Sequence, residues 1–108
     1  MAQNFRRFTS NNVGTGATTV LTADSYDTVV GISLANVTSS AITASCYIND
    51  SSNDIHLVKD VSIPAGSSLQ VLDGGAKFVL QSGDALKVIS DTASSLDVWV
   101  SVVDAIST

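Results

Sequence analysis

Apolar and polar residues alternate along most of this chain with a period of two. The clearest alternation covers residues 42–48, where Thr43, Ser45 and Tyr47 separate Ile42, Ala44, Cys46 and Ile48. Because successive side chains of a β-strand point to opposite faces of a sheet, this pattern predicts a half-buried strand. We place Cys46 on the buried face, since a small thiol inside an apolar alternation is usually a packing residue.

Short segments of the same kind follow one another at a spacing of about ten residues. In residues 26–37 the even-numbered positions, from Tyr26 and Thr28 to Leu34, are predicted to face inward. The segment 96–103 is apolar on both faces, which favours a central strand or one covered by another subunit. Further strands are predicted at residues 17–22, 55–59, 61–63, 69–72, 77–80 and 85–90.

Turn-forming residues separate these segments. Pro64-Ala65-Gly66 ends a strand because proline has no N–H to donate to a ladder. Asp73-Gly74-Gly75 predicts a tight hairpin turn, with residues 77–80 as the return or the next strand, and Gln81-Ser82-Gly83-Asp84 predicts another turn. Asp60, a charge between two apolar runs, marks a bulge or a bend.

The composition supports an all-β chain. Glu is absent, while Ser, Thr and β-branched residues are abundant, and no long window has helical periodicity. We therefore predict an antiparallel β-sandwich, jelly-roll or immunoglobulin-like, or a small barrel, with about eight to ten short strands. At 108 residues the chain has room for one core, so residues 13–108 are predicted to form a single β-sandwich domain.

Residues 1–12 are predicted to form an extended N-terminal arm. Phe5, Arg6, Arg7 and Phe8 lie in it, ahead of a polar run. Such an arm either adds an edge strand to the sheet or docks on a neighbouring molecule. In the second case these four residues would contact the partner.

The charge of the chain excludes several classes of partner. A net charge of −5 argues against binding nucleic acid through its phosphates, which requires many Lys and Arg contacts. There is no uninterrupted apolar run of the length that spans a membrane, and no classical signal peptide opens the chain, so we expect no membrane partner.

Candidate catalytic chemistry is sparse. The chain has one His, one Cys and no Glu, and its aspartates fall mostly in turns. His56 would need a carboxylate partner to act as a base, and a lone histidine on a short strand is more often a surface or packing residue. No Gly-x-Ser-x-Gly elbow is present. We expect no catalytic residues and no cofactor.

Two further motifs have structural interpretations that we prefer. Asp50, Asn53 and Asp54 form an oxygen-rich loop that loosely resembles a calcium site, but the spacing of an EF-hand is missing, and a turn that caps its own backbone fits better. Asn36-Val37-Thr38 and Asn49-Asp50-Ser51 match the glycosylation pattern by chance. We expect no metal site.

Tyr47 and Trp99 are the large side chains best suited to anchor a partner. Both fall on the parity opposite the main apolar face of their strands. They would either contact a partner or belong to a second layer of the core.

The segments from Ile63 to Asp104 resemble small virion structural proteins of tailed bacteriophages, including those that infect cyanobacteria. The resemblance rests on the run from Ile63 to Leu69, on residues 77–88 and on residues 96–102. It implies a β-sandwich that decorates capsids or joins the neck and tail, located in the virion.

The function that we expect is therefore a non-enzymatic capsid decoration, or cement, protein. It would form a homo-oligomer, with a trimer suiting three-fold positions, and bind the major capsid protein; a neck or tail component with neck or tail partners is the nearest alternative. A host-surface or carbohydrate-binding module is the second class, with Tyr47, Trp99 and the loop 50–54 as its candidate residues.

Overall fold

A computed structural model describes residues 4–23, 27–72 and 78–104 of the chain. All regular structure in these residues is β-strand. The strands are β1 (Asn4–Val13), β2 (Thr18–Thr22), β3 (Asp27–Asn36), β4 (Ile42–Asn49), β5 (Asp54–Ile63), β6 (Ser68–Leu72), β7 (Phe78–Leu80), β8 (Ala85–Ser90) and β9 (Leu96–Asp104). No helix long and apolar enough to cross a bilayer occurs in them.

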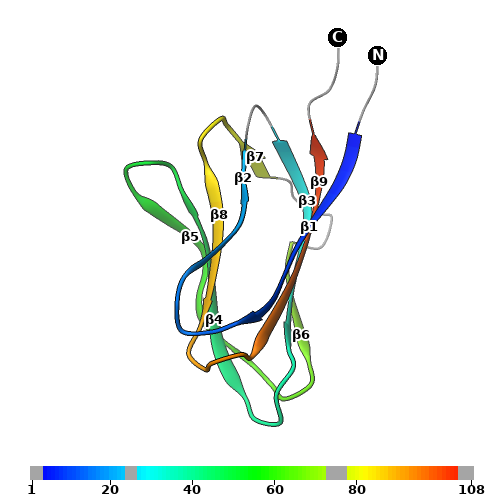
Figure 1. Cartoon of the computed structure of the whole chain (residues 1–108), viewed down its shortest axis with the longest axis vertical. Coiled ribbons are helices and arrows are strands. Elements are labelled where there is room, and N and C mark those ends of the chain that lie inside the picture. The colour runs from blue at the N-terminus through cyan, green and yellow to red at the C-terminus, as the bar shows by residue number, and fades with distance from the viewer. Residues whose placement is uncertain (1–3, 24–26, 73–77, 105–108) are drawn as a thin grey trace.

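The strands form two antiparallel sheets packed into a β-sandwich, which confirms the predicted fold class (Figure 1). One sheet has the order β1-β9-β3-β6, with β7 also paired to β3. The other sheet has the order β2-β8-β4-β5. The molecule measures 47 × 27 × 21 Å.

The strand β9 is central in its sheet, which is one of the two arrangements that its apolar faces predicted. It pairs with β1 on one side and with β3 on the other, and the three strands lie side by side in Figure 1. Of the two expectations for the N-terminal segment, the structure has the added edge strand, because β1 pairs with β9 from Asn4↔Asp104 to Val13↔Leu96. Removing β1 would therefore uncover one side of β9.

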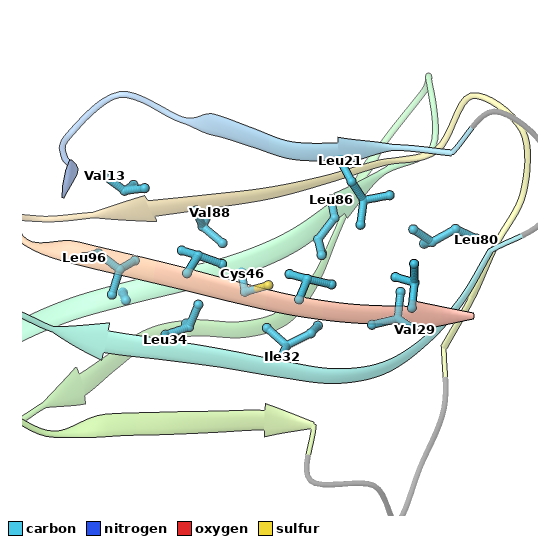
Figure 2. Close-up of a cluster of buried hydrophobic side chains, with 14 of the residues drawn as sticks. Val13, Leu21, Val29, Ile32, Leu34, Cys46, Leu80, Leu86, Val88 and Leu96 are labelled. Atoms are coloured by element: carbon cyan, nitrogen blue, oxygen red, sulfur yellow. The ribbon is translucent and has the colours of Figure 1, made fainter. Parts of the chain in front are cut away.

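The core lies between the two sheets and is built almost entirely from aliphatic side chains. Cys46 is fully buried among them, as predicted, and Figure 2 shows its sulfur inside this cluster. The large side chains that are completely buried include Ile32, Leu34, Ile42, Ile63, Leu80, Leu86 and Leu96.

The inward face of β3 differs from the prediction in its first half. Ile32 and Leu34 are buried as expected, but before them it is Val29, not Thr28 or Val30, that is buried. The pairing with β9 shifts register between Val29 and Gly31, so one extra residue is inserted there. Such a bulge reverses the parity of the strand, which a period-two rule does not foresee. Tyr26, also predicted inward, lies outside the described residues.

Residues 54–63 form one strand, β5, where the alternation predicted two. The bulge expected at Asp60 is present: the pairing with β4 shifts register here, and Asp60 has φ of 52°. The Asp60 N–H donates to Ser45 Oγ at 2.9 Å across the bulge. This hydrogen bond satisfies a backbone donor that the regular ladder leaves without a partner.

The predicted hairpin at Asp73-Gly74-Gly75 falls outside the described residues. The strands on either side of it, β6 and β7, both pair with β3, one with residues 32–35 and the other with residues 27–29. They therefore lie one after the other along the same edge of β3, and the described residues of the two strands share no ladder. The turn at Gln81–Asp84 is confirmed, with Gly83 at φ of 93°.

The side chain of Asn36 ties three segments together at one end of the sandwich. Its Nδ2 donates to the carbonyl oxygens of Ser40, Ile63 and Pro64 at 2.8, 3.0 and 3.2 Å. Its Oδ1 accepts hydrogen bonds from the N–H and the hydroxyl of Thr38. Asn36 is only 2% exposed, so the match to the glycosylation pattern here is accidental, as expected.

We predict that Asn36→Ala lowers the free energy of unfolding by about 3 kcal/mol, because buried backbone groups lose their partners. Asn36→Asp should cost at least as much, since a carboxylate would face the carbonyl oxygens of Ser40 and Ile63. Urea denaturation measures both values. Asn53→Ala, at an exposed loop position, is the control and should change stability by less than about 0.5 kcal/mol; equal costs would contradict the role given to Asn36.

Candidate functional site

The outward face of the sheet that contains β1, β9, β3 and β7 carries three of the five exposed large hydrophobic side chains found in the described residues. Since Leu96, Val98, Val100 and Val102 of β9 point into the core, the residues between them point outward. Phe5 of β1, Trp99 of β9 and Val79 of β7 are respectively 74%, 51% and 64% exposed. We call this surface the outer face.

One line of residues crosses the outer face from edge to edge. Phe5 is in register with Val103, Val103 with Thr28, and Thr28 with Val79. Adjacent strands of a sheet lie about 4.8 Å apart, so these four side chains are direct neighbours. We call them the apolar row. Three of the four are purely apolar, and none is buried.

Trp99 is four residues from Val103 along β9. At a rise of ~3.3 Å per residue, the two positions are about 13 Å apart. It is in register with Thr9 on one side and Ser33 on the other. The guanidinium carbon of Arg7 lies 5.6 Å from the centre of its ring, a cation–π contact. Trp99 is thus held at the surface and is not part of a second core layer.

A pocket of about 310 Å³ opens beside Trp99. Five of the eight residues around it have hydroxyl, amide or carboxylate side chains, and the other three are apolar or aromatic. Asp97 Oδ1 accepts a hydrogen bond from the N–H of Asn12 at 3.1 Å, and Asn12 has φ of 55° at an irregularity in the β1–β9 pairing. The irregular backbone of β1 therefore positions one side of the pocket. Its lining comprises Thr9, Ser10, Asn11, Ser33, Ala35, Asp97, Val98 and Trp99.

The four N-terminal residues predicted to contact a partner, Phe5 to Phe8, lie on two different sides of β1. Phe5 and Arg7 are in register with Val103 and Ser101 and belong to the outer face. Phe8 is in register with Val100, is partly buried, and packs against the core, with the Arg6 guanidinium 5.0 Å from its ring centre. The four residues therefore do not form one contact surface.

Tyr47 belongs to the other sheet, on β4, and does not share a surface with Trp99. It is in register with His56 of β5, and the two rings lie 4.9 Å apart at 33°. His56 is exposed, and its ring contacts that of Tyr47. Tyr47 and Trp99 therefore lie on different sheets and do not form one aromatic platform.

The oxygen-rich loop after β4 is a self-capping turn, as expected. Asp50 Oδ1 accepts hydrogen bonds from the N–H groups of Ser52 and Asn53, and these bonds, that of Asn53 first, lower the pKa of Asp50. Asn49 Nδ2 donates to Asp54 Oδ1 at 2.7 Å. Within residues 4–23, 27–72 and 78–104, no group of acidic, His or Cys side chains is arranged to hold a metal ion.

No protein-family model and no curated protein matches the sequence. One solved structure that is similar comes from a Bacillus endospore appendage, described as one of a novel family of disulfide-linked pili. The likeness covers 98% of this chain and 88% of that one, with a TM-score of 0.55 and 13% sequence identity. At this identity the similarity concerns the fold, and it supports the β-sandwich.

Sequence reasoning identified Phe5, Arg7 and Trp99 but missed their partners on the outer face. Val79 and Val103 were assigned to strands, yet nothing local indicates that β7, β3, β9 and β1 are neighbours in that order. Thr9, Asn11 and Asp97 look like ordinary polar strand residues. The one available signal was parity, because Asp97 and Trp99 alternate with the buried valines of β9.

Cys46 is the only cysteine of the chain, and burial raises the pKa of its thiol to about 12. The thiolate is the reactive form, so the native thiol is both inaccessible and almost entirely protonated at pH 8. We predict that a disulfide reagent labels Cys46 in the native protein at least ~100-fold more slowly than in guanidinium-unfolded protein. The absorbance of the released reagent measures both rates. Equal rates in the native and unfolded protein would show that the thiol is accessible in the native state.

Proposed function

We propose that this chain is a non-enzymatic structural subunit of a bacteriophage virion, which decorates the capsid surface as a homo-oligomer. The observation that supports this function best is the apolar row across the outer face, from Phe5 to Val79. A surface row in which three of four adjacent side chains are apolar is typical of surfaces that associate with another protein. The partner that we assign to this row is a second copy of the chain.

The charge of the chain favours association through this row. Each copy carries a net charge of −5, so two copies repel one another wherever charged surfaces meet. The apolar row has no ionisable side chain and therefore offers a contact free of that repulsion. A face of a molecule that measures 47 × 27 Å is also wide enough for the roughly 800 Å² that each partner buries in a standard interface.

The virion as the location of this assembly is supported by the resemblance of residues 63–104 to phage structural proteins. The similar fold of the endospore pilus protein is consistent with a β-sandwich acting as a building block of an extracellular assembly. The same surface would serve a subunit of the neck or tail, where copies also repeat around a symmetry axis.

We predict that the protein forms trimers in solution and that Val79→Asp converts them to monomers. The substitution places a charge in the apolar row, at its β7 end, while the exposed position on the short edge strand β7 leaves the core untouched. Light scattering after size exclusion measures the mass. Val37→Asp introduces the same charge at another exposed valine, outside the row, and should leave the oligomer intact.

Attachment to the virion is tested with capsids of the cognate phage that lack the protein. The wild-type chain and Val37→Asp should sediment with the capsids, and Val79→Asp should bind at least ~10-fold more weakly because it binds as single copies. A wild-type protein that stays monomeric at about 1 mM and does not bind capsids would contradict the proposal.

A further inference from the structure

The pocket beside Trp99 is a second feature of the outer face, separate from the apolar row. Trp99 and Val103 are four residues apart on β9, and none of the row residues lines the pocket. We propose that this pocket binds one ring of a neutral sugar. The inference goes beyond the assembly function and does not depend on it.

The wall of the pocket is an exposed indole whose position is constrained. Arg7, in register with Ser101, lies on one side of Trp99, whereas Asn11 and Asp97 lie on the other side along the strands. The cation–π contact with Arg7 therefore supports the indole from the side away from the pocket. A ring that is held in place loses little conformational freedom when a ligand packs against it.

The polar groups of the pocket suit a ligand with many hydroxyl groups. Asp97 Oδ2 and the side chains of Thr9 and Asn11 form no hydrogen bonds within the described parts of the chain, so they can bond to a ligand. Ser33 Oγ accepts from Gln70 Nε2 at 3.1 Å and keeps its own proton to donate. Together they supply acceptors and donors on a short arc around one apolar wall.

A pyranose ring matches this combination because it has an apolar face of C–H groups and a rim of hydroxyls. An indole packs against such a face, and carboxylate and amide groups bond to the rim. A volume of about 310 Å³ is at the small end of ligand pockets, which fits one sugar ring, such as the terminal residue of a glycan, rather than a long chain.

Charged ligands fit the pocket less well. Its lining contains Asp97 and no cationic side chain, and the chain carries a net charge of −5, so phosphate groups and acidic sugars are repelled. A nucleic-acid base could stack on an indole, but its neighbouring phosphates require basic side chains that this pocket lacks. A neutral sugar is the class that the charges favour.

Binding can be followed at the site itself, because Trp99 is the only tryptophan of the chain. The methyl α-glycosides of glucose, galactose and mannose are titrated against the intact protein up to about 100 mM, since a single ring in a shallow pocket binds in the millimolar range. At least one should change the emission of Trp99 saturably. It should also shift the amide NMR signals of residues 9–11, 33–35 and 97–99. Sialyllactose and inorganic phosphate should cause no saturable change.

Asp97→Asn and Asn11→Ala should each weaken the binding at least ~5-fold while the fluorescence of the free protein stays close to that of the wild type. The matched control is Val79→Asp, on the same face but outside the pocket, which should bind the sugar normally even though it disrupts the oligomer. No saturable response to any of the three glycosides, or shifts that are spread over the whole molecule, would overturn the proposal. A wild-type protein that stays monomeric but binds the sugar would contradict only the structural function.

Discussion

The burial of every second side chain of β9 is the constraint from which the surface of this molecule follows. Leu96, Val98, Val100 and Val102 are at most 3% exposed, and each buried aliphatic side chain stabilises the fold by about 1.5–3 kcal/mol. A slip of one residue in the register with β1 or β3 would expose all four and force Asp97 and Trp99 into the core. Which residues of β9 point outward is therefore determined by packing in the core and not by interactions at the surface.

This constraint gives the outer face two regions with different chemistry. Near the end of β9, Val103 is in register with Phe5 on one side and Thr28 on the other, and Thr28 with Val79, which produces the apolar row. Near its beginning, Trp99 is in register with the hydroxyl-bearing residues Thr9 and Ser33, and the irregular pairing at Asn12 brings a backbone N–H to Asp97. The first region suits contact with protein, and the second suits a small polar ligand. The proposed contact between copies and the proposed sugar site therefore occupy separate parts of one sheet.

The parts of the fold that could be predicted from sequence are those that depend on one strand at a time. The alternation in residues 42–48 and the double-sided apolar pattern of residues 96–103 correctly indicated the buried Cys46 and the central β9. The bulge that buries Val29 depends on how β3 pairs with β9, and the collinear arrangement of β6 and β7 depends on β3 as a shared neighbour. For the same reason the residues of the candidate site were found singly, and their grouping into a row and a pocket was not.

The same core also determines how copies of the chain can be held together. Cys46 lies among the aliphatic side chains between the sheets, and burial raises the pKa of its thiol to about 12, so a disulfide between copies would require the sandwich to open. In the assembly that we propose, copies of a chain with no other cysteine would be held by non-covalent contacts. The net charge of each copy opposes association. The favourable free energy of association would therefore come from apolar area buried between the copies, at about 25 cal/mol for each Å² removed from water. The large apolar side chains that the fold leaves exposed on its outer face are where that area is found.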